Sequence, residues 1–171
     1  MNRNRISFVR GVDTSGAQPP SGFPYRFAVL TWFASGPDSA DPWPLLRLIT
    51  PRIMELVGAD VVVGEIWERR SWLRAFNSAR KVRETLISEW LSKGDNELHE
   101  EGDFPSKLRF ERNGEIVLWM ESEMWRRVGG PLPYHDSVTM SFFSKYDLAK
   151  EFEELFRAEA AKAGVRIEEA V

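Results

Sequence analysis

The sequence predicts an α+β fold, with an antiparallel-rich sheet and about three helices packed mainly on one face. In the first half of the chain, short apolar segments alternate with segments of helical period, whereas strand-like segments follow one another in the second half. A run of strands beside helices is typical of α+β proteins. The chain has 171 residues and neither a low-complexity linker nor a repeat. We therefore expect a single domain over 1–171, with a loose, Pro- and Gly-rich segment at 1–25.

The first half predicts two strands and two helices. Residues 27–33 and 60–68 are short apolar runs rich in β-branched and aromatic residues, which is typical of buried strands. Apolar side chains recur at helical spacing over 43–57, where Pro51 predicts a kink or a restart. The same spacing over 71–93 predicts the longest helix of the chain.

The second half contains the clearest local signal, a β-hairpin. Two strand-like segments, 108–112 and 115–121, flank an Asn-Gly pair at 113–114. Asn-Gly is the pair that two-residue hairpin turns prefer, because both positions need a positive φ. A further strand is predicted over 137–143.

The last helix is predicted from a capping box at its beginning. Ser144 is followed three residues later by Asp147, and apolar residues at helical spacing continue up to Gly164. Residues 165–167 would then add a short edge strand.

Composition excludes several classes of protein. The absence of cysteine excludes disulfides, thiolate metal sites and cysteine nucleophiles. A net charge of −3 argues against a nucleic-acid-binding protein, which would be strongly basic. No apolar run approaches the roughly 20 residues of a membrane span, and residues 1–13 lack the apolar stretch of a secretory signal. We expect a cytoplasmic protein without direct contact to nucleic acid or membrane, and leave its oligomeric state open.

The chain's two histidines do not complete a recognised catalytic or metal-binding motif. His135 stands beside Asp136 and Ser137, but neighbours on an extended chain point to opposite faces and no GxSxG motif presents a serine. His99 lies in an acidic segment without the HExxH spacing of a helical zinc site. The Gly-Gly-Pro sequence at 129–131 predicts a turn and lacks the pattern of a phosphate-binding loop. We therefore expect no cofactor, no metal and no catalytic triad.

Two glutamates leave an enzymatic alternative open. Glu121 and Glu123 are two residues apart on a predicted strand, so both would face the same side. A metal-dependent hydrolase or nuclease could use this pair together with His135 and Asp136. The simpler interpretation is a polar strip on the strand.

Charge is distributed unevenly along the chain. Seven basic residues lie between 69 and 93, whereas nine acidic and three basic residues lie between 95 and 123. A solvated helix face followed by a soluble loop would explain both patches. The functional interpretation is that the acidic tract meets a basic partner, because a matching field accelerates association.

The seven tryptophans divide into core and contact candidates. Those on apolar stripes or strands are predicted to lie in the core: Trp32, Trp67, Trp72, Trp90 and Trp119. Trp43 stands between two prolines and Trp125 is followed by Arg126, and these two are the candidates for contact with a partner. Tryptophan and arginine are enriched in the hot spots of protein interfaces.

Residues 121–144, ESEMWRRVGGPLPYHDSVTMSFFS, resemble immunity proteins of bacterial polymorphic-toxin systems, of the immunity protein 52 type. The resemblance rests on an acidic strand, the Gly-Gly-Pro turn, the Pro-Tyr-His-Asp-Ser sequence at 133–137, and Thr139. It implies a cytoplasmic, non-catalytic α+β protein that blocks a cognate toxin, including toxins associated with type VI secretion. Restriction-endonuclease-like toxins accompany this type.

Our hypothesis from the sequence is an immunity or inhibitor protein that occludes a toxin, possessing no enzymatic activity of its own. The residues expected to contact the partner are Asp95, Glu97, Glu100, Glu101, Asp103, Trp125, Arg126, Tyr134, His135 and Asp136. A phage-encoded inhibitor of a bacterial defence system is a second alternative, because it would also be a small, acidic, cysteine-free binding protein and would differ only in its target.

Overall fold

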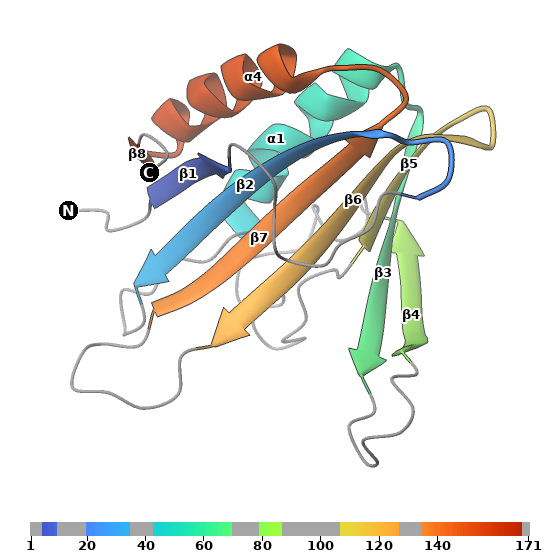
Figure 1. The fold of residues 1–171 in the computed structure, drawn as a ribbon, viewed down its shortest axis with the longest axis horizontal. Coiled ribbons are helices and arrows are strands. Elements are labelled where there is room, and N and C mark those ends of the chain that lie inside the picture. Colours follow the sequence, from blue (N-terminus) through green and yellow to red (C-terminus); the bar gives the residue numbers. More distant parts are fainter. Residues whose placement is uncertain are drawn as a thin grey trace.

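The computed structural model describes residues 5–9, 20–34, 43–69, 79–86, 107–126 and 135–168. The elements in these ranges are β1 (Arg5–Val9), β2 (Tyr25–Ala34), α1 (Trp43–Val57), β3 (Val61–Arg69), β4 (Ala79–Leu86), β5 (Lys107–Arg112), β6 (Glu115–Arg126), β7 (His135–Ser144), α4 (Ala149–Lys162) and β8 (Arg166–Glu168) (Figure 1). Neither of these two helices is long and apolar enough to cross a membrane.

The described strands form one sheet of eight in the order β4-β3-β5-β6-β7-β2-β1-β8. Each neighbouring pair is antiparallel except β1 and β8, which are parallel. The long strands β2, β7 and β6 run side by side through its centre (Figure 1). The expected α+β fold with an antiparallel-rich sheet is confirmed.

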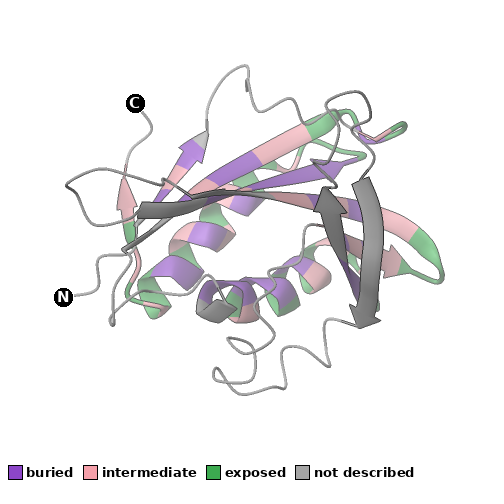
Figure 2. Cartoon of the chain, turned by 90° about the horizontal axis from the view of Figure 1, so that it is seen from below, coloured by how far each residue is buried: buried purple, intermediate pink, exposed green. Residues whose placement is uncertain are grey.

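Both described helices cover the same face of the sheet (Figure 2). Alternate residues of the central strands, such as Met120 and Phe142, are fully buried against them. Phe27 and Phe142 are paired across β2 and β7. Their ring centroids lie 5.3 and 5.2 Å from that of Phe152 on α4. This stack of aromatic rings fixes α4 on the sheet.

The prediction of a helix over 71–93 is wrong for the part of this segment that the structure describes. Residues 79–86 form β4, which pairs antiparallel with β3. β3 pairs with β5 along one edge, and the backbone N–H and C=O groups on its other edge form hydrogen bonds with β4. Hydrogen bonds between distant segments of this kind can outweigh a helical pattern in the sequence. The described residues thus contain two helices where about three were expected, and the rest of 71–93 lies outside them.

The N-terminal segment also differs from expectation. Residues 1–25 were expected to be loose, but Arg5–Val9 forms β1 between β2 and β8. Ile6 and Phe8 alternate into the core, where both are buried. A five-residue strand offers too short an alternation to be recognised from sequence alone.

The hairpin and the other predicted strands are confirmed with small shifts in their ends. Asn113 and Gly114 have φ values of 52° and 79°, as the predicted Asn-Gly turn between β5 and β6 requires. The segments predicted at 27–33, 60–68, 137–143 and 165–167 correspond to β2, β3, β7 and β8.

The helix ends show where local signals succeed and fail. α1 continues through Pro51 as one helix, so the alternative of a restart is not observed. The capping box predicted at Ser144 is wrong, because Ser144 still pairs with β2 and β6 as the last residue of β7. Its hydroxyl donates to the carbonyl of Tyr146, and Asp147 instead accepts a hydrogen bond of 3.2 Å from the backbone N–H of Ala149. α4 therefore begins several residues later than the capping box predicts.

Candidate functional site

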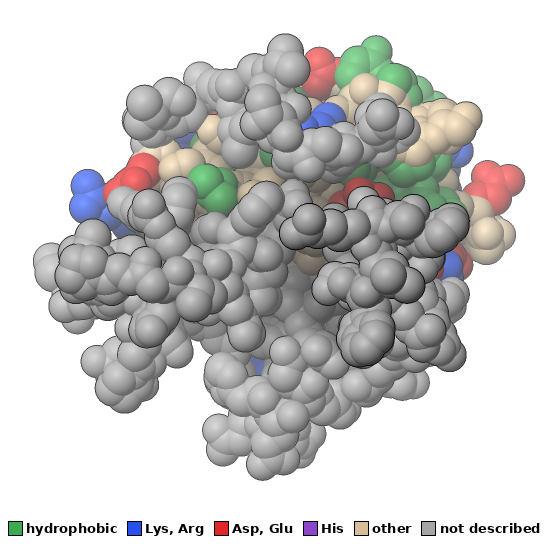
Figure 3. Space-filling model, turned by 60° about the horizontal axis from the view of Figure 1, so that its bottom comes forward, with side chains coloured by type: hydrophobic (Ala, Val, Ile, Leu, Met, Phe, Trp, Pro, Cys, Tyr) green, Lys and Arg blue, Asp and Glu red, His purple; other side chains and the backbone are tan. Residues whose placement is uncertain are grey.

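The face of the sheet opposite the helices carries charged residues at regular positions. Glu65, Lys107, Glu121 and Ser141 are paired in one row across β3, β5, β6 and β7. These positions alternate with the core positions of the same strands and therefore belong to the other face. Among the described side chains that reach the surface, acidic, basic and hydrophobic ones lie close together (Figure 3).

An ion network on this face neutralises a buried carboxylate. Glu65 is only 3% exposed. Its Oε1 accepts a hydrogen bond from Nη1 of Arg109 at 2.5 Å, and Nε of Arg109 donates to Oε1 of Glu111 at 3.2 Å. A buried charge is tolerated only when it is paired and hydrogen-bonded. The geometry therefore assigns Arg109 a structural task, holding β3 and β5 together.

The predicted carboxylate pair begins beside this network. Glu121 and Glu123 pair with Ser141 and Thr139 of β7, so their positions belong to one face, as the spacing predicted. Oε1 of Glu121 lies 3.2 Å from Nζ of Lys107. Nothing is described of the side chain of Glu123. Within the described ranges, no group of three or more His, Asp and Glu side chains could hold a metal ion.

The strand register separates the four residues of the enzymatic alternative. His135 lies six positions along β7 from the partner of Glu121 and four from the partner of Glu123. At about 3.3 Å per residue, these offsets amount to roughly 20 and 13 Å along the strand. Asp136 pairs with Arg126, an odd number of positions from Glu123, and therefore lies on the opposite face of the sheet. These backbone positions do not converge on one reacting atom.

The same register brings four of the predicted contact residues together, and we call them the strand-end group. Arg126 pairs with Asp136, Trp125 precedes Arg126, and His135 precedes Asp136. Successive residues of a strand alternate between faces, so Arg126 and Asp136 lie on one face of the sheet and Trp125 and His135 on the other. The end of β2 joins them, because Ala34 pairs with His135 (Figure 1). The side chains of this group are not described. The other predicted contact residues lie outside the described part of the chain: Asp95, Glu97, Glu100, Glu101, Asp103 and Tyr134.

The tryptophan predictions are partly corrected. Trp119 was expected in the core but is only half-buried, and it pairs with Arg109 and Phe143 on the face opposite the helices. Trp43 is the first residue of α1 and Trp125 lies near the end of β6, and neither side chain is described. Trp32 and Trp67 lie on β2 and β3 as expected, with their side chains likewise not described, whereas Trp72 and Trp90 fall outside the described residues.

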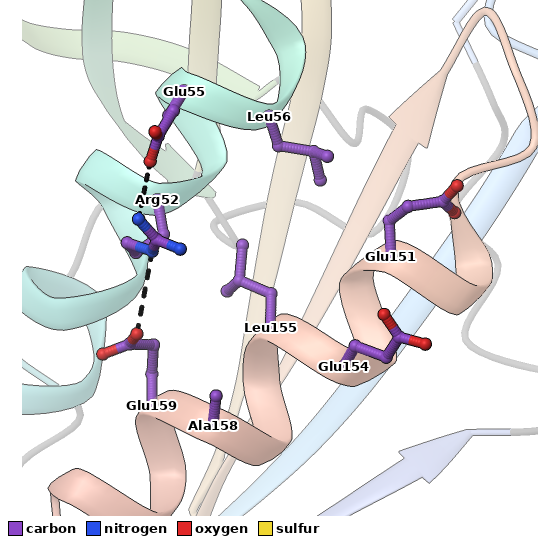
Figure 4. A pocket seen from close by; sticks show the side chains of 8 residues that line it. All are labelled: Arg52, Glu55, Leu56, Glu151, Glu154, Leu155, Ala158 and Glu159. Atoms are coloured by element: carbon purple, nitrogen blue, oxygen red, sulfur yellow. Dashed lines mark hydrogen bonds and ion pairs between the residues drawn. The ribbon is translucent and has the colours of Figure 1, made fainter.

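Sequence reasoning missed a groove between α1 and α4. Its volume is about 420 Å³, and its lining residues are Arg52, Glu55, Leu56, Glu151, Glu154, Leu155, Ala158 and Glu159. The two leucines lie between the Glu55 and Glu159 side of the groove and the Glu151 and Glu154 side (Figure 4). A partial signal was present, because α4 carries glutamates at helical spacing, but its alignment with α1 depends on the fold.

The two sides of this groove differ in how their carboxylates are paired. Arg52 lies between two of them, with Nη1 2.6 Å from Oε2 of Glu55 and Nε 3.8 Å from Oε1 of Glu159. Lys162 adds a contact of 2.7 Å to Glu159. On the other side, Glu154 has only a contact of 3.9 Å with Lys150, and both of these side chains are largely exposed. The side of the groove that carries Glu151 and Glu154 therefore keeps more uncompensated negative charge than the side beside Arg52.

Comparisons of this chain with protein-family models, with curated proteins and with solved structures gave no significant match.

Proposed function

We propose that this chain is an immunity or inhibitor protein that binds and occludes a cognate bacterial toxin, with a nuclease effector as the target class. The proposal starts from the resemblance of residues 121–144 to immunity proteins. This segment includes the second half of β6 and all of β7. The proposed contact surface therefore lies on two adjacent central strands rather than on a peripheral element.

The observation that carries the proposal is the register of β6 and β7. It places Trp125, Arg126, His135 and Asp136 at the same end of the paired strands, two on each face of the sheet, while it separates Glu121 from His135 by roughly 20 Å. A binding surface needs neighbouring residues on a rigid support, whereas catalysis needs them to meet at one atom. The register therefore favours occlusion of a partner over the hydrolase or nuclease alternative.

Charge supports the same interpretation. The chain has a net charge of −3, and its acidic tract at 95–103 lies between β4 and β5 in the sequence. A nuclease presents a positive surface to its phosphate substrate, so an acidic inhibitor would be steered toward that surface. Trp125 on one face of the strand end and Arg126 on the other would then provide anchors that slow dissociation of a partner that covers this end of the strands.

Binding kinetics against the protein encoded next to this chain's gene would test the proposal. Reversing all five charges of the acidic tract (Asp95, Glu97, Glu100, Glu101 and Asp103) to lysine should slow association by about tenfold and flatten its salt dependence. Trp125→Ala should instead accelerate dissociation by about tenfold or more.

Tyr146→Ala is the matched control, because Tyr146 is 73% exposed and follows β7 at the strand's other end. It should leave both rate constants unchanged. Equal effects of Trp125→Ala and Tyr146→Ala would contradict the proposed surface. A neighbouring gene of phage origin, with a defence protein as the bound partner, would favour the phage-encoded inhibitor instead.

A further inference from the structure

We propose that the groove between α1 and α4 binds a basic amphipathic helix of a partner protein. The bound helix would insert leucine-like side chains between α1 and α4 and place lysine or arginine over the groove's carboxylates. This inference goes beyond the toxin-inhibitor function and does not require it. It rests on the groove's shape, its apolar centre and its charge.

The apolar centre of the groove explains why an apolar side chain would enter it. Leu56 is 36% exposed although it belongs to the helix layer, and Leu155 and Ala158 continue the apolar surface on α4. Covering these side chains removes apolar surface from water. α1 and α4 have 15 and 14 residues, so a helix of about four turns could lie along both. Helices docked into apolar grooves in this way are a recurring mode of peptide recognition.

The charge of the groove determines the sign of the partner. Its lining contains four glutamates and one arginine. Arg52 contacts Glu55 and Glu159, whereas Glu151 has no ion-pair partner among the described residues and Glu154 has only the distant Lys150. Cations above Glu151 and Glu154 would therefore gain pairs that the described residues do not already supply. Their aliphatic stems could at the same time cover Leu155.

The same charge argues against other occupants. A second copy of this chain that docked groove to groove would place its own four glutamates against these, and like charges in contact oppose association. An anionic membrane surface would be repelled for the same reason. A basic helix is the occupant that matches both the apolar centre and the acidic rim.

The experiment uses the full chain and a labelled synthetic peptide of about 14 residues, with leucine at every third or fourth position and lysine elsewhere. Fluorescence anisotropy measures its affinity. A peptide of the same composition, with leucines placed so that they form no single helical face, serves as the probe control and should bind at least about fivefold more weakly. Amide chemical shifts should change on α1 and α4 when the amphipathic peptide is added.

Two matched pairs of variants locate the binding site. Glu151→Gln with Glu154→Gln should weaken peptide binding by about fivefold, whereas Glu115→Gln, at the exposed β5–β6 turn, should not change it. Leu56→Ala should weaken binding by about fivefold to tenfold. Leu48→Ala is its control, because Leu48 is equally exposed on the same helix but does not line the groove.

Three results would overturn the inference: no binding of the amphipathic peptide, equal effects of groove and control variants, or a groove-dependent dimer of the chain in analytical ultracentrifugation. These measurements contain no toxin. A chain that binds the peptide in the groove but fails to bind its neighbour-encoded protein would refute only the proposed function. The reverse outcome would refute only the groove.

Discussion

The two faces of the sheet stabilise the same strands by different physics. On β6, Leu118 and Met120 point to the helix-covered face and are fully buried, whereas Trp119 and Glu121 between them are half-buried on the other face. The first face is held by packing against α1 and α4. The second carries ion pairs between adjacent strands, such as Lys107 with Glu121. One strand thus belongs to an apolar core and to a polar network at once.

This difference predicts what a substitution leaves behind on each face. A truncated side chain in the core leaves a cavity that no other residue fills. A truncated member of the ion network deprives its partner of that ion pair, and removal of the partner as well can relieve the loss. Whether a second substitution restores the lost stability therefore distinguishes the two faces more clearly than the loss of stability caused by the first substitution.

The largest effect is expected on the helix-covered face. Phe152→Ala should lower the free energy of unfolding by about 4 kcal/mol, because it removes a fully buried ring that stacks on Phe27 and Phe142. Urea denaturation measures the change. Leu48→Ala, at an exposed position of α1, should cost about 1 kcal/mol or less. Similar losses in the two variants would contradict the assignment of Phe152 to the core.

A smaller but compensable effect is expected from the ion network. Arg109→Met should destabilise the protein by about 3 kcal/mol, because it leaves the buried carboxylate of Glu65 without its guanidinium partner. The double variant Glu65→Leu with Arg109→Met should recover most of that loss, since an apolar pair replaces both charges. Denaturant unfolding of Arg109→Met, of Glu65→Leu and of the double variant gives the coupling free energy between the two residues. Additive losses would show that the pair is not coupled as the geometry indicates.

The smallest effect is expected from the more exposed ion pair beside this network, between Lys107 and Glu121. Lys107 and Glu121 are 33% and 26% exposed, so water and salt screen their pair. Lys107→Met should change stability by about 0.5 kcal/mol or less. The wild-type chain and this variant should become indistinguishable in thermal unfolding at high salt. A loss as large as that of Arg109→Met would contradict the view that exposure to water weakens this pair relative to Glu65 and Arg109.

Local signals predicted those parts of the fold whose hydrogen bonds lie within one element or one turn. The helix at 43–57 and the Asn-Gly hairpin were recognisable because their residues interact with near neighbours in sequence. β2, β3 and β7 were recognisable from their apolar, β-branched and aromatic residues, although they pair with distant segments. β4 was not, because its apolar spacing fits a helix and only its pairing with β3 makes it a strand. β1 likewise depends on neighbours, β2 and β8, from distant parts of the chain.

The candidate sites divide in the same way. Spacing along β6 predicted that Glu121 and Glu123 share a face, because strand periodicity is local. The register that separates Glu121 from His135 is a property of two paired strands, so sequence spacing did not reveal it. The groove joins Glu55 of α1 to Glu154 of α4, and no local pattern brings these residues together.

Growth rescue in a bacterial host tests the central claim most directly. The neighbour-encoded protein would be expressed from an inducible promoter, with this chain, Trp125→Ala or Tyr146→Ala supplied in trans at equal levels. Occlusion of a toxin predicts full rescue by the unmodified chain and by Tyr146→Ala, and impaired rescue by Trp125→Ala. Absence of rescue by the unmodified chain, with the toxic activity of its neighbour intact, would contradict the claim.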